Sequence, residues 1–483
     1  MKKLITATIV MLLSIASYAQ LAEDALRFSQ SFYQGTARSM GAGGAFGAVG
    51  ADFSTASTNP AGLGLFRSYD MTITPEVFSR KTESTYNGSY KEDARTVFDL
   101  SNLGYVMTTP LNSSGWKFFQ FAVGMNRLNN YNANIHMQGY NTTNSKLDVY
   151  WEQADFVPYD QLIDEDPFYL EPAWAVYLLD TVPGFIDLYD YPLANNNEIL
   201  QTQQVFSRGS TNEWVFSFAS NYNDVLFLGA TIGLPYIRYN RETFYQEEFS
   251  SDNVPAFQRW SVTEYLTTNG WGINLKLGAI VKPNDWIRFG AAFHTPSYYW
   301  NMQDVWNTVT TATYGGETYE AQSVVTGNYN YRFYTPLKAI GNLAVFFNPY
   351  GFISAEYEYA DYSQARFKSQ NSGSLDVNDD IRDAYQSTHN LRFGTEWRIG
   401  YISLRGGYGF TTSPYANNLN DGKRTSISGG IGYKKGEFAL DLAYIHTTTN
   451  EDYYLYSYND ITTNPIANKY TTSQYAATIR FNF

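Results

Sequence analysis

Apolar and polar residues alternate along much of this chain with a period of two. From Trp271 to Val281, every second side chain is apolar, whereas most of the residues between them are polar or glycine. The segment Lys282-Pro283-Asn284-Asp285 interrupts the pattern, which then resumes from Ile287 to Phe293. Such an alternation on both sides of a tight turn predicts a β-hairpin with one apolar and one polar face.

Further segments carry the same alternation, and together they predict an all-β fold, a transmembrane antiparallel β-barrel of about 14 strands. Strands of about ten residues suit a tilted crossing of a bilayer, whereas about five or six residues are usual in globular proteins. Short turns alternate with longer polar loops, and an even count places both chain ends on the periplasmic side. The predicted strands are 69–78, 97–108, 116–127, 213–221, 225–239, 270–281, 286–295, 338–347, 352–360, 390–399, 401–411, 425–433, 437–447 and 473–483.

Composition favours a membrane barrel over a soluble all-β protein, although it does not exclude the latter. Aromatic residues make up 17% of the chain, including 42 tyrosines, and charged residues only 16%. Tyrosine and tryptophan favour membrane–water interfaces, and the polar inner face of a barrel keeps the mean hydropathy low, here −0.36. The absence of cysteine excludes a disulfide scaffold and thiol chemistry.

Both ends of the chain fit export to an outer membrane of the Gram-negative type. Residues 1–19 resemble a signal peptide, with a basic start, an apolar run and a cleavage site before Gln20. Cleavage would remove two lysines and change the formal net charge from −13 to −15. The last strand ends with Phe481 and Phe483 on its apolar face, which is similar to the closing strand that barrel-assembly machinery recognises.

A glycine-rich segment from Gly35 to Phe66 precedes the first predicted strand and holds eight of the chain's 37 glycines. Because it has few large side chains, it cannot form a core of its own and needs walls from elsewhere in the chain. A dinucleotide-binding loop is excluded, because Phe46 occupies the position of the third glycine and no strand precedes the motif. We therefore predict a plug, or hatch, over residues 20–67 inside a barrel formed by residues 68–483.

The hatch segment resembles that of the FadL/TodX family of outer-membrane transport proteins. The resemblance rests on Gly41-Ala42-Gly43-Gly44-Ala45-Phe46, followed by Asn59-Pro60-Ala61-Gly62-Leu63. Weaker matches follow in the same order, among them Phe293-His294-Thr295-Pro296-Ser297, Tyr334-Thr335-Pro336 and Arg405-Gly406-Gly407-Tyr408. The resemblance implies that hydrophobic molecules bind at the outer loops, pass to a pocket in the lumen and leave sideways through the wall.

From this resemblance we expect a monomeric channel, in contact with outer-membrane lipid, for the uptake of hydrophobic compounds. Long-chain fatty acids or aromatic hydrocarbons are the expected ligands, with passive release past the hatch. The glycine content favours a hatch that moves. The Asn59-Pro60 turn would lie beside the strand from Trp116 to Arg127, where Gly124 permits a bulge or kink and thus a lateral opening.

Five basic residues fall on the predicted lumen faces and are candidates to hold the carboxylate headgroup of a ligand. They are Lys276, Arg288, Arg392, Arg398 and Arg405. The alternative role for these residues is pairing with acids on the same faces, such as Glu356, Glu396 and Asp441. Both roles remain open at the level of sequence.

The loop predicted from 128 to 212 departs from the family pattern by its length. Between Leu147 and Ser207 it has twelve acidic residues and no Lys or Arg, together with aromatic residues and five prolines. This composition predicts either a partly ordered cap with short helices or a solvated acidic loop. As a cap it would offer a hydrophobic landing site that repels free carboxylates unless divalent cations intervene.

Two other classes of function remain open. The barrel could be a docking component of a protein-secretion or surface-assembly system, because the acidic loop suits a protein partner as well. A lipid-modifying enzyme is less favoured, because the four histidines are dispersed and no nucleophile motif or metal-ligand spacing occurs. We expect no catalytic residue, cofactor or metal, and the acidic chain without basic stripes argues against nucleic acid.

Overall fold

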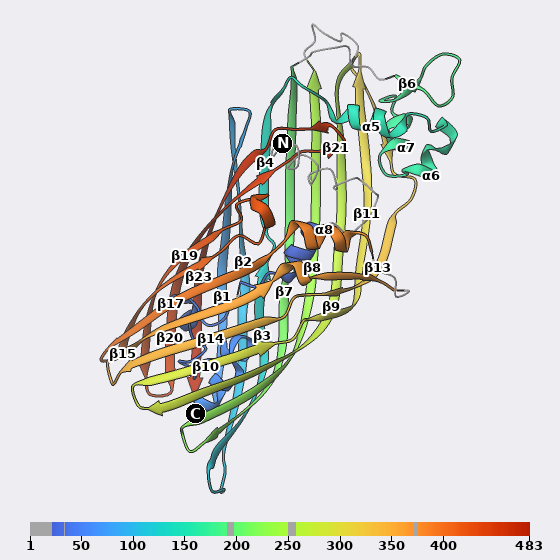
Figure 1. Cartoon of the computed structure of the whole chain (residues 1–483). Helices are drawn as coiled ribbons and strands as arrows, with labels where there is room; N and C mark the ends of the chain where they lie inside the picture. Colours follow the sequence, from blue (N-terminus) through green and yellow to red (C-terminus); the bar gives the residue numbers. More distant parts are fainter. Residues whose placement is uncertain (1–21, 33, 191–197, 250–256, 371–374) are drawn as a thin grey trace.

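The structure, a computed structural model, describes residues 22–32, 34–190, 198–249, 257–370 and 375–483. They form a closed antiparallel barrel of 14 strands, which confirms the predicted fold class (Figure 1). The ring closes where β1 (Asp70–Tyr86) pairs with β23 (Ile466–Asn482), the last strand of the chain. The predicted signal peptide lies outside the described residues.

All fourteen predicted strands occur in the wall, and four of them are divided into two parts along their course. In ring order the wall consists of β1, β2 (Ser89–Pro110), β3 (Trp116–Asn130) with β4 (Ala133–Asn141), β7 (Ile199–Tyr222), β8 (Leu226–Phe249), β9 (Phe257–Asn284), β10 (Ile287–His294) with β11 (Tyr298–Tyr314), β14 (Lys338–Phe347) with β13 (Gly327–Tyr334), β15 (Gly351–Asp361) with β16 (Arg366–Ser369), β17 (Ser387–Ile399), β18 (Ile402–Thr411), β19 (Arg424–Lys435), β20 (Phe438–Tyr453) and β23. The short strand β12 (Glu317–Gln322) extends β11 as a hairpin.

Several strands are much longer than their apolar alternation predicts, and the excess lies at the end that carries the long loops. β7 and β8 each have 24 residues, and β9 has 28. The loop predicted from 128 to 212 is therefore wrong at both ends, since β3 and β4 continue to Asn141 and β7 begins at Ile199. Beyond the bilayer both faces of a strand meet polar surroundings, so the alternation that predicts a strand is lost.

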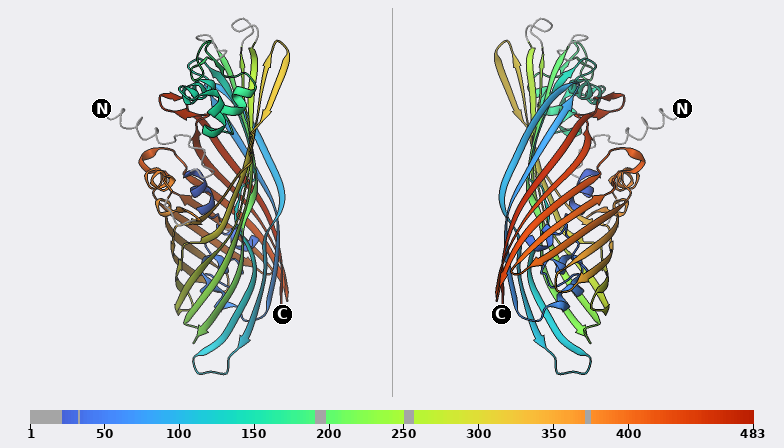
Figure 2. Two further views of the ribbon diagram at one scale, coloured as in Figure 1. Left: turned by 90° about the vertical axis from the view of Figure 1, so that its right-hand side faces the viewer. Right: turned by 90° about the vertical axis from the view of Figure 1, so that its left-hand side faces the viewer.

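The N-terminal segment lies inside the barrel, as the blue ribbon in Figures 1 and 2 shows. It contains α2 (Ala22–Ser29), α3 (Ala37–Gly41), α4 (Thr55–Thr58) and the 3-10 helix η1 (Pro60–Leu65). Polar side chains cap these short helices: Thr36 Oγ1 accepts from the Ser39 amide at 3.2 Å, and Asn59 Oδ1 accepts from the Ala61 amide at 3.2 Å. Small residues and local caps thus let the segment fold compactly against the wall.

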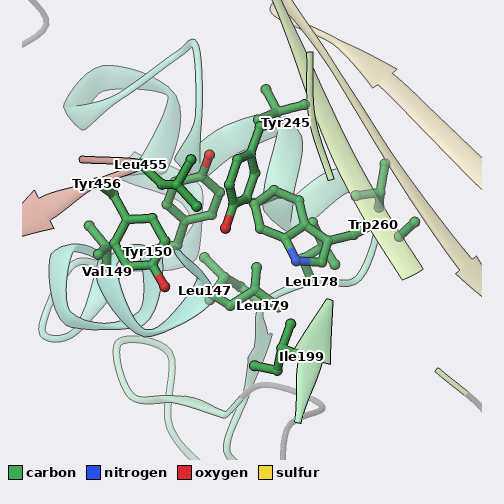
Figure 3. Close-up of a cluster of buried hydrophobic side chains, with 14 of the residues drawn as sticks. Leu147, Val149, Tyr150, Leu178, Leu179, Ile199, Tyr245, Trp260, Leu455 and Tyr456 are labelled. Carbon is green, nitrogen blue, oxygen red and sulfur yellow. The ribbon is translucent and has the colours of Figure 1, made fainter. Parts of the chain in front are cut away.

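Residues 142–190 form a cap at the end of the barrel that carries the long loops, so of the two predicted forms of this loop the structure has the cap (Figure 1). Its elements are α5 (Lys146–Ala154), η2 (Tyr159–Gln161), α6 (Leu162–Glu165), α7 (Leu170–Ala175), β5 (Asp180–Thr181) and β6 (Tyr189–Asp190). Figure 3 shows its core, in which Leu147, Tyr150 and Leu179 pack against Tyr245 of β8 and Trp260 of β9. This apolar contact anchors the cap to the extended strands.

The remaining outer loops carry η3 (Tyr362–Gln364), α8 (Val377–Ala384), η4 (Ala416–Asn418) and the hairpin β21 (Ser457–Tyr458) with β22 (Ile461–Thr462). No helix in the described part of the chain is long and apolar enough to cross a membrane.

Apolar side chains project from the outside of the lower barrel. Ile273, Leu277 and Phe293 are 42%, 46% and 44% exposed, whereas Asn274 and Lys276 between them are buried. The alternation therefore places apolar residues outward and polar residues inward, the arrangement of a strand that faces lipid.

We expect the purified protein to remain folded in mild detergent until it is heated, because a closed ring of hydrogen-bonded strands has no free edge from which to unravel. An unheated sample should migrate differently on a gel from a boiled one, which should run near the chain mass of 54.8 kDa. Identical migration, together with recovery of the protein in the soluble fraction, would contradict the membrane barrel.

Candidate functional site in the barrel lumen

The hatch fills the lower lumen, and a network of ion pairs around Glu396 joins it to the wall. The Glu396 carboxylate of β17 lies 3.0 Å from Arg38 of α3, 2.8 Å from Arg398 and 2.8 Å from Arg405 of β18. Arg405 also pairs with Asp441 of β20 at 2.7 Å. Separating such buried partners would leave charges uncompensated at low dielectric, so the network holds α3 in place.

A second network joins the hatch to β14, β15 and β17. Arg392 lies 3.2 Å from Glu356 and 2.6 Å from Glu358. Glu356 also accepts hydrogen bonds from Asn342 at 2.6 Å and from the backbone amide of Gly47 at 3.2 Å. The hatch backbone therefore completes a charged site whose other members belong to the wall.

A third contact lies where the hatch meets β7, β9 and β10. Lys276 pairs with Glu213, and Ser57 of α4 donates to the same carboxylate at 2.9 Å. His294 Nε2 lies 2.7 Å from the carbonyl oxygen of Thr58, which requires the ring nitrogen to donate because a carbonyl only accepts. Wall side chains thus bind both side chains and backbone of the hatch.

These networks contain four of the five residues predicted as headgroup contacts. Lys276, Arg392 and Arg405 are buried against protein carboxylates, and the half-exposed Arg398 pairs with Glu396. The alternative role that the sequence left open, pairing with lumen acids, is the one that the structure has. As headgroup contacts these residues would first have to leave their partners.

The fifth predicted residue, Arg288, also binds the hatch. It donates to the carbonyl oxygen of Val49 at 2.6 Å, and its guanidinium lies 4.1 Å from the centre of the Phe346 ring. Arg288 therefore supports the hatch backbone through its Nη1 donor.

The glycine motif of the hatch is explained by its close approach to the wall. Gly43 has a φ of +66°, and a Cβ at this position would lie 2.7 Å from the carbonyl oxygen of Phe393. The Gly43 amide donates to Ser428 of β19 at 3.0 Å. A side chain at Gly43 would therefore be strained and would also separate the hatch from the wall.

The bulge predicted at Gly124 is wrong. The ladders of β3 with β2 and with β7 are continuous through this residue, so the wall is closed there. A Cβ at Gly124 would lie 2.5 Å from the ring of Phe53 in the hatch. Glycine at this position makes room for an aromatic side chain of the hatch, which the sequence alone did not reveal.

The position expected for the Asn59-Pro60 turn is also wrong. The turn lies against β8 and β9, where Gly229 and Gly278 leave space for it, and not against the strand from Trp116 to Arg127. Asn59 Nδ2 also donates to Ala279 O at 3.4 Å. Glycines on two neighbouring strands, which meet only in the folded wall, decide where the turn fits.

An apolar region, here called the aromatic chamber, occupies the lumen around α2. Its walls include Tyr131, Tyr239, Tyr299, Tyr331, Phe333, Tyr362 and Phe367. Phe28 of α2 lies edge-on to three of these rings, with centroids 5.9–6.4 Å apart. Ala22, Ala25 and Leu26 of α2 are buried in the same cluster, so the N-terminal helix itself fills the chamber.

Two neighbouring strands of the wall are interrupted beside this chamber. Thr295-Pro296-Ser297 separates β10 from β11, and Thr335-Pro336-Leu337 separates β14 from β13. The prolines have no amide to donate, and the Ser297 amide donates to the side chain of Thr335 at 2.9 Å in place of a ladder bond. Tyr299 and Phe333, which line the chamber, lie two residues from these breaks.

Besides Arg288, four arginines on the lumen face lack a carboxylate within 4.0 Å among the described residues: Arg80 of β1, Arg95 of β2, Arg241 of β8 and Arg424 of β19. The sequence did not single out any of the four, because each lies just beyond the end of a predicted strand. Extending the alternation outward along β1, from Glu76 and Phe78 to Arg80, is the signal that would have found the first of them.

The histidines are dispersed in the structure. His294 binds the hatch, whereas His389 Nδ1 lies 2.7 Å from the Tyr357 hydroxyl and His446 Nδ1 lies 3.4 Å from that of Tyr444. Within the described ranges, no group of three or more His, Asp or Glu side chains is placed to hold a metal ion.

No protein-family model and no curated protein matches the sequence of this chain. Solved structures do match its fold. The toluene transporter TodX of Pseudomonas putida covers 94% of this chain and 100% of its own, at 14% identity and a TM-score of 0.54. A FadL homologue of Pseudomonas aeruginosa covers 94% of this chain and 100% of its own, at 14% identity and a TM-score of 0.57. The toluene transporter TbuX of Ralstonia pickettii covers 94% of this chain and 99% of its own, at 16% identity and a TM-score of 0.51. The resemblance to the FadL/TodX family is thus confirmed at the level of the fold.

Proposed function

We propose that this chain is an outer-membrane channel for the uptake of hydrophobic compounds. The observation that carries the proposal is the aromatic chamber, which lies in the lumen of a closed barrel between a wall break and an ion-paired hatch. A water-filled pore needs neither an apolar chamber nor a plug. TodX and TbuX, which share the fold, are toluene transporters.

A molecule in the aromatic chamber has two ways out of the barrel. The path through the hatch crosses the ion pairs of Glu396 and Arg392, where an apolar molecule would displace buried charges from their partners. The path through the wall leads past the proline breaks to Phe293 and Leu337, which are 44% and 41% exposed on the lipid-facing side. We therefore place sideways release at these breaks, instead of at Gly124.

The same contacts indicate which part of the N-terminal segment moves. α3 and α4 are tied to the wall by buried charges, whereas α2 lies in the chamber among apolar side chains. Its Arg27 is paired within the helix, with Asp24. We propose that α2 leaves the chamber when a ligand enters, while the hatch from Ala37 to Leu65 stays in place.

Uptake by a deletion strain tests the proposed function. Removal of the gene should lower the uptake of a labelled long-chain fatty acid or of toluene, and the full-length chain should restore it. Because the chamber is apolar and the hatch is charged, uptake of a small sugar should not change. If both hydrophobic probes enter the deletion strain at the wild-type rate, the channel proposal is wrong.

Replacing Pro296 and Pro336 with valine should lower the uptake of the hydrophobic probe several-fold. Valine supplies the amide donors that proline lacks and favours a strand, so the ladder can continue across the breaks and close the wall. Pro110→Val, at the end of β2 away from the chamber, is the matched control and should retain full uptake. Unchanged uptake in a folded double variant would exclude release at these breaks.

Docking of a protein partner is the second candidate function, because the acidic cap exposes aromatic side chains. Phe156 and Tyr177 are 74% and 60% exposed, and both have positive φ, 67° and 63°. A hydrogen bond from the Phe156 amide to the Asp187 carbonyl at 2.7 Å places Phe156 beside the exposed Ile186. A contiguous patch of exposed apolar side chains marks an interaction site more often than a single exposed apolar side chain does.

Replacing Phe156, Tyr177 and Ile186 with serine separates the two functions. The docking function predicts loss of a co-purifying secretion or assembly component with uptake intact. If transport is the function, uptake should fall when the cap collects the ligand, and it should stay unchanged when the cap takes no part in transport.

The proposal includes a monomer that barrel-assembly machinery folds through the closing strand with Phe481 and Phe483, and that contacts outer-membrane lipid. Both termini would be periplasmic. Passage through such a channel breaks no covalent bond, so the proposal assigns no catalytic residue and no cofactor.

A further inference from the structure

The outer face of the wall carries a row of aromatic side chains, here called the aromatic row. Tyr236 of β8 and Trp271 of β9 lie opposite each other, with ring centroids 4.6 Å apart. Tyr298 of β11 and Tyr334 of β13 form a second pair, stacked at 4.8 Å. The two pairs lie at nearly the same level, because Tyr298 is opposite Ile273, two residues from Trp271. Tyrosine and tryptophan favour the level of lipid headgroups, so this row marks one boundary of the bilayer.

The outward-facing residues change their character at the aromatic row. Toward the short turns, β9 presents Ile273, Leu275 and Leu277, which are 39–46% exposed. Toward the long loops, the same face of β9 presents Asn269 and Thr267. The row therefore separates an apolar band, which contacts acyl chains, from the polar part of the wall. Lipid headgroups of the outer leaflet lie directly beyond the row.

Two basic side chains lie next to the aromatic row, on its polar side. Arg332 of β13 and Lys368 of β16 are direct partners in an antiparallel ladder, so their side chains leave the same face. That face is the outer one, because their neighbours Tyr331, Phe333 and Phe367 are fully buried in the aromatic chamber. The two cations are therefore presented to the surroundings of the barrel.

The contacts of these two side chains within the protein are neutral. Arg332 Nη2 donates to the carbonyl oxygen of Gln370 at 3.3 Å, and Lys368 Nζ lies 5.2 Å from the centre of the Tyr334 ring. Among the residues that the structure describes, no carboxylate lies within 4.0 Å of either cation.

This arrangement is unfavourable unless a negative charge joins it. Like charges directly opposite each other in an antiparallel ladder destabilise the pairing. Elsewhere on the outer face the chain places a carboxylate beside such a lysine: Lys81 lies 2.7 Å from Glu92, and Lys469 lies 3.3 Å from Glu83. The partner that suits Arg332 and Lys368 is therefore an anion from outside the chain.

Arg238 of β8 lies exposed on the same outer face and at the same level. The ladder register runs from Arg238 through Asn269 of β9 and Gln303 of β11 to Asn330 of β13, two residues from Arg332. The positions between the two arginines thus carry amides. A headgroup that lies along this row meets cations at both ends and hydrogen-bonding groups between them.

We infer that Arg332, Lys368 and Arg238 bind the phosphorylated sugar headgroup of a glycolipid of the outer leaflet. Its acyl chains lie on the apolar band on the other side of the aromatic row. The guanidinium fork matches a phosphate, the ammonium group adds a point charge, and the amides suit sugar hydroxyls. This inference rests on the outer-membrane location in the proposed function, and it does not depend on what passes through the lumen.

Binding of lipid A, a phosphorylated glycolipid, and of dephosphorylated lipid A to the full chain in detergent tests the inference. The wild type should bind lipid A more tightly than the dephosphorylated form. The double variant Arg332→Gln/Lys368→Gln should weaken binding of lipid A at least about tenfold, because each cation beside an anionic lipid headgroup contributes about fivefold. Its binding of dephosphorylated lipid A should not change.

The double variant Lys117→Gln/Lys435→Gln is the matched control. It also removes two exposed cations, but at the end of the barrel that carries the short turns, and it should bind both probes as the wild type does. Both double variants should keep the migration difference between unheated and boiled samples. If the first of them does not fold, Arg332→Lys keeps the charge but loses the fork, and it should weaken binding of lipid A less than tenfold.

Four outcomes would overturn the inference. Equal loss of binding for both probes would show that the two side chains only shape the surface, and unchanged binding of lipid A would show that they do not hold the phosphate. Displacement of lipid A by equimolar inorganic phosphate would show a site for small anions. A change from dimer to monomer in the variant, with lipid A binding unchanged, would show an interface between copies of this chain.

Failure of this inference is distinguishable from failure of the proposed function. Lipid A binding is measured on the purified protein, whereas transport is measured as uptake in the deletion strain. Normal uptake in that strain, together with phosphate-dependent binding of lipid A, would remove transport and support the lipid site.

Discussion

A disulfide that holds α2 in the aromatic chamber should abolish the uptake of a hydrophobic compound, and reduction should restore it. The native chain has no cysteine, so an engineered pair forms the only disulfide. One cysteine replaces Ala25, which is fully buried in the chamber, and the second is scanned along Asn378–Ala384 of α8, which packs against α2. Uptake should stop because the helix occupies the volume that the ligand needs.

A second disulfide, between Gly41→Cys and Ala443→Cys, is the matched control. A Cβ at Gly41 would lie 3.5 Å from the Cβ of Ala443, within the range of a disulfide. This pair locks the hatch to β20, and we expect uptake to continue at the wild-type rate. If the disulfide between hatch and β20 stops uptake and the disulfide between α2 and α8 does not, then the hatch moves, as its glycine content leads us to expect, and α2 is not the moving part.

Replacing Glu396 with glutamine should loosen the hatch and make the barrel leak ions. Glutamine has the size of glutamate but no charge, so the three arginines around it lose their common partner, and Arg38 loses its tie to the wall. Removing one member of a buried ion pair costs about 3–5 kcal/mol. The free energy of unfolding in denaturant should fall by about this amount, and the single-channel conductance in a planar bilayer should rise.

Glu317→Gln provides the control for this experiment. Glu317 begins the exposed strand β12 and accepts a hydrogen bond from the Tyr319 hydroxyl at 3.2 Å, so its substitution should change neither quantity. A conductance in Glu396→Gln equal to that of the wild type, at an unchanged free energy of unfolding, would show that the Glu396 network does not hold the hatch.

The strands of this protein were predictable because a bilayer acts on each strand separately. Lipid on one side and a polar lumen on the other impose a period of two on every crossing segment, such as 270–281, whichever strands pair with it. The hatch was predictable for a similar reason, since a run of small residues that cannot form a core needs an enclosing wall. The alternation of apolar and polar residues is lost where the bilayer ends, as in the outer halves of β7 and β8, and the predicted strands therefore stop short of the observed ones.

Contacts inside the lumen were not predictable in this way. The sequence placed Arg392 and Arg405 on the inner face and offered Glu356 and Asp441 as possible partners, but it did not decide between ion pairing and ligand binding, and it did not indicate Glu358. A glycine inside a predicted strand, such as Gly124, indicates a special position. The reason that glycine is needed there is the ring of Phe53, about seventy residues earlier in the chain.

The sequence by itself thus determined a membrane barrel with a plug. The alternation of apolar and polar residues and the composition are local properties, because the bilayer imposes them on each strand separately. Only the tertiary structure decided which charges are paired, where the Asn59-Pro60 turn lies, and that Arg80, Arg95 and Arg424 have no carboxylate within 4.0 Å in the described part of the chain. The physical reason is that a charge is compensated by whatever lies within a few ångströms of it. In a closed ring those neighbours come from strands far apart in the chain, and from a hatch that meets many of them at once.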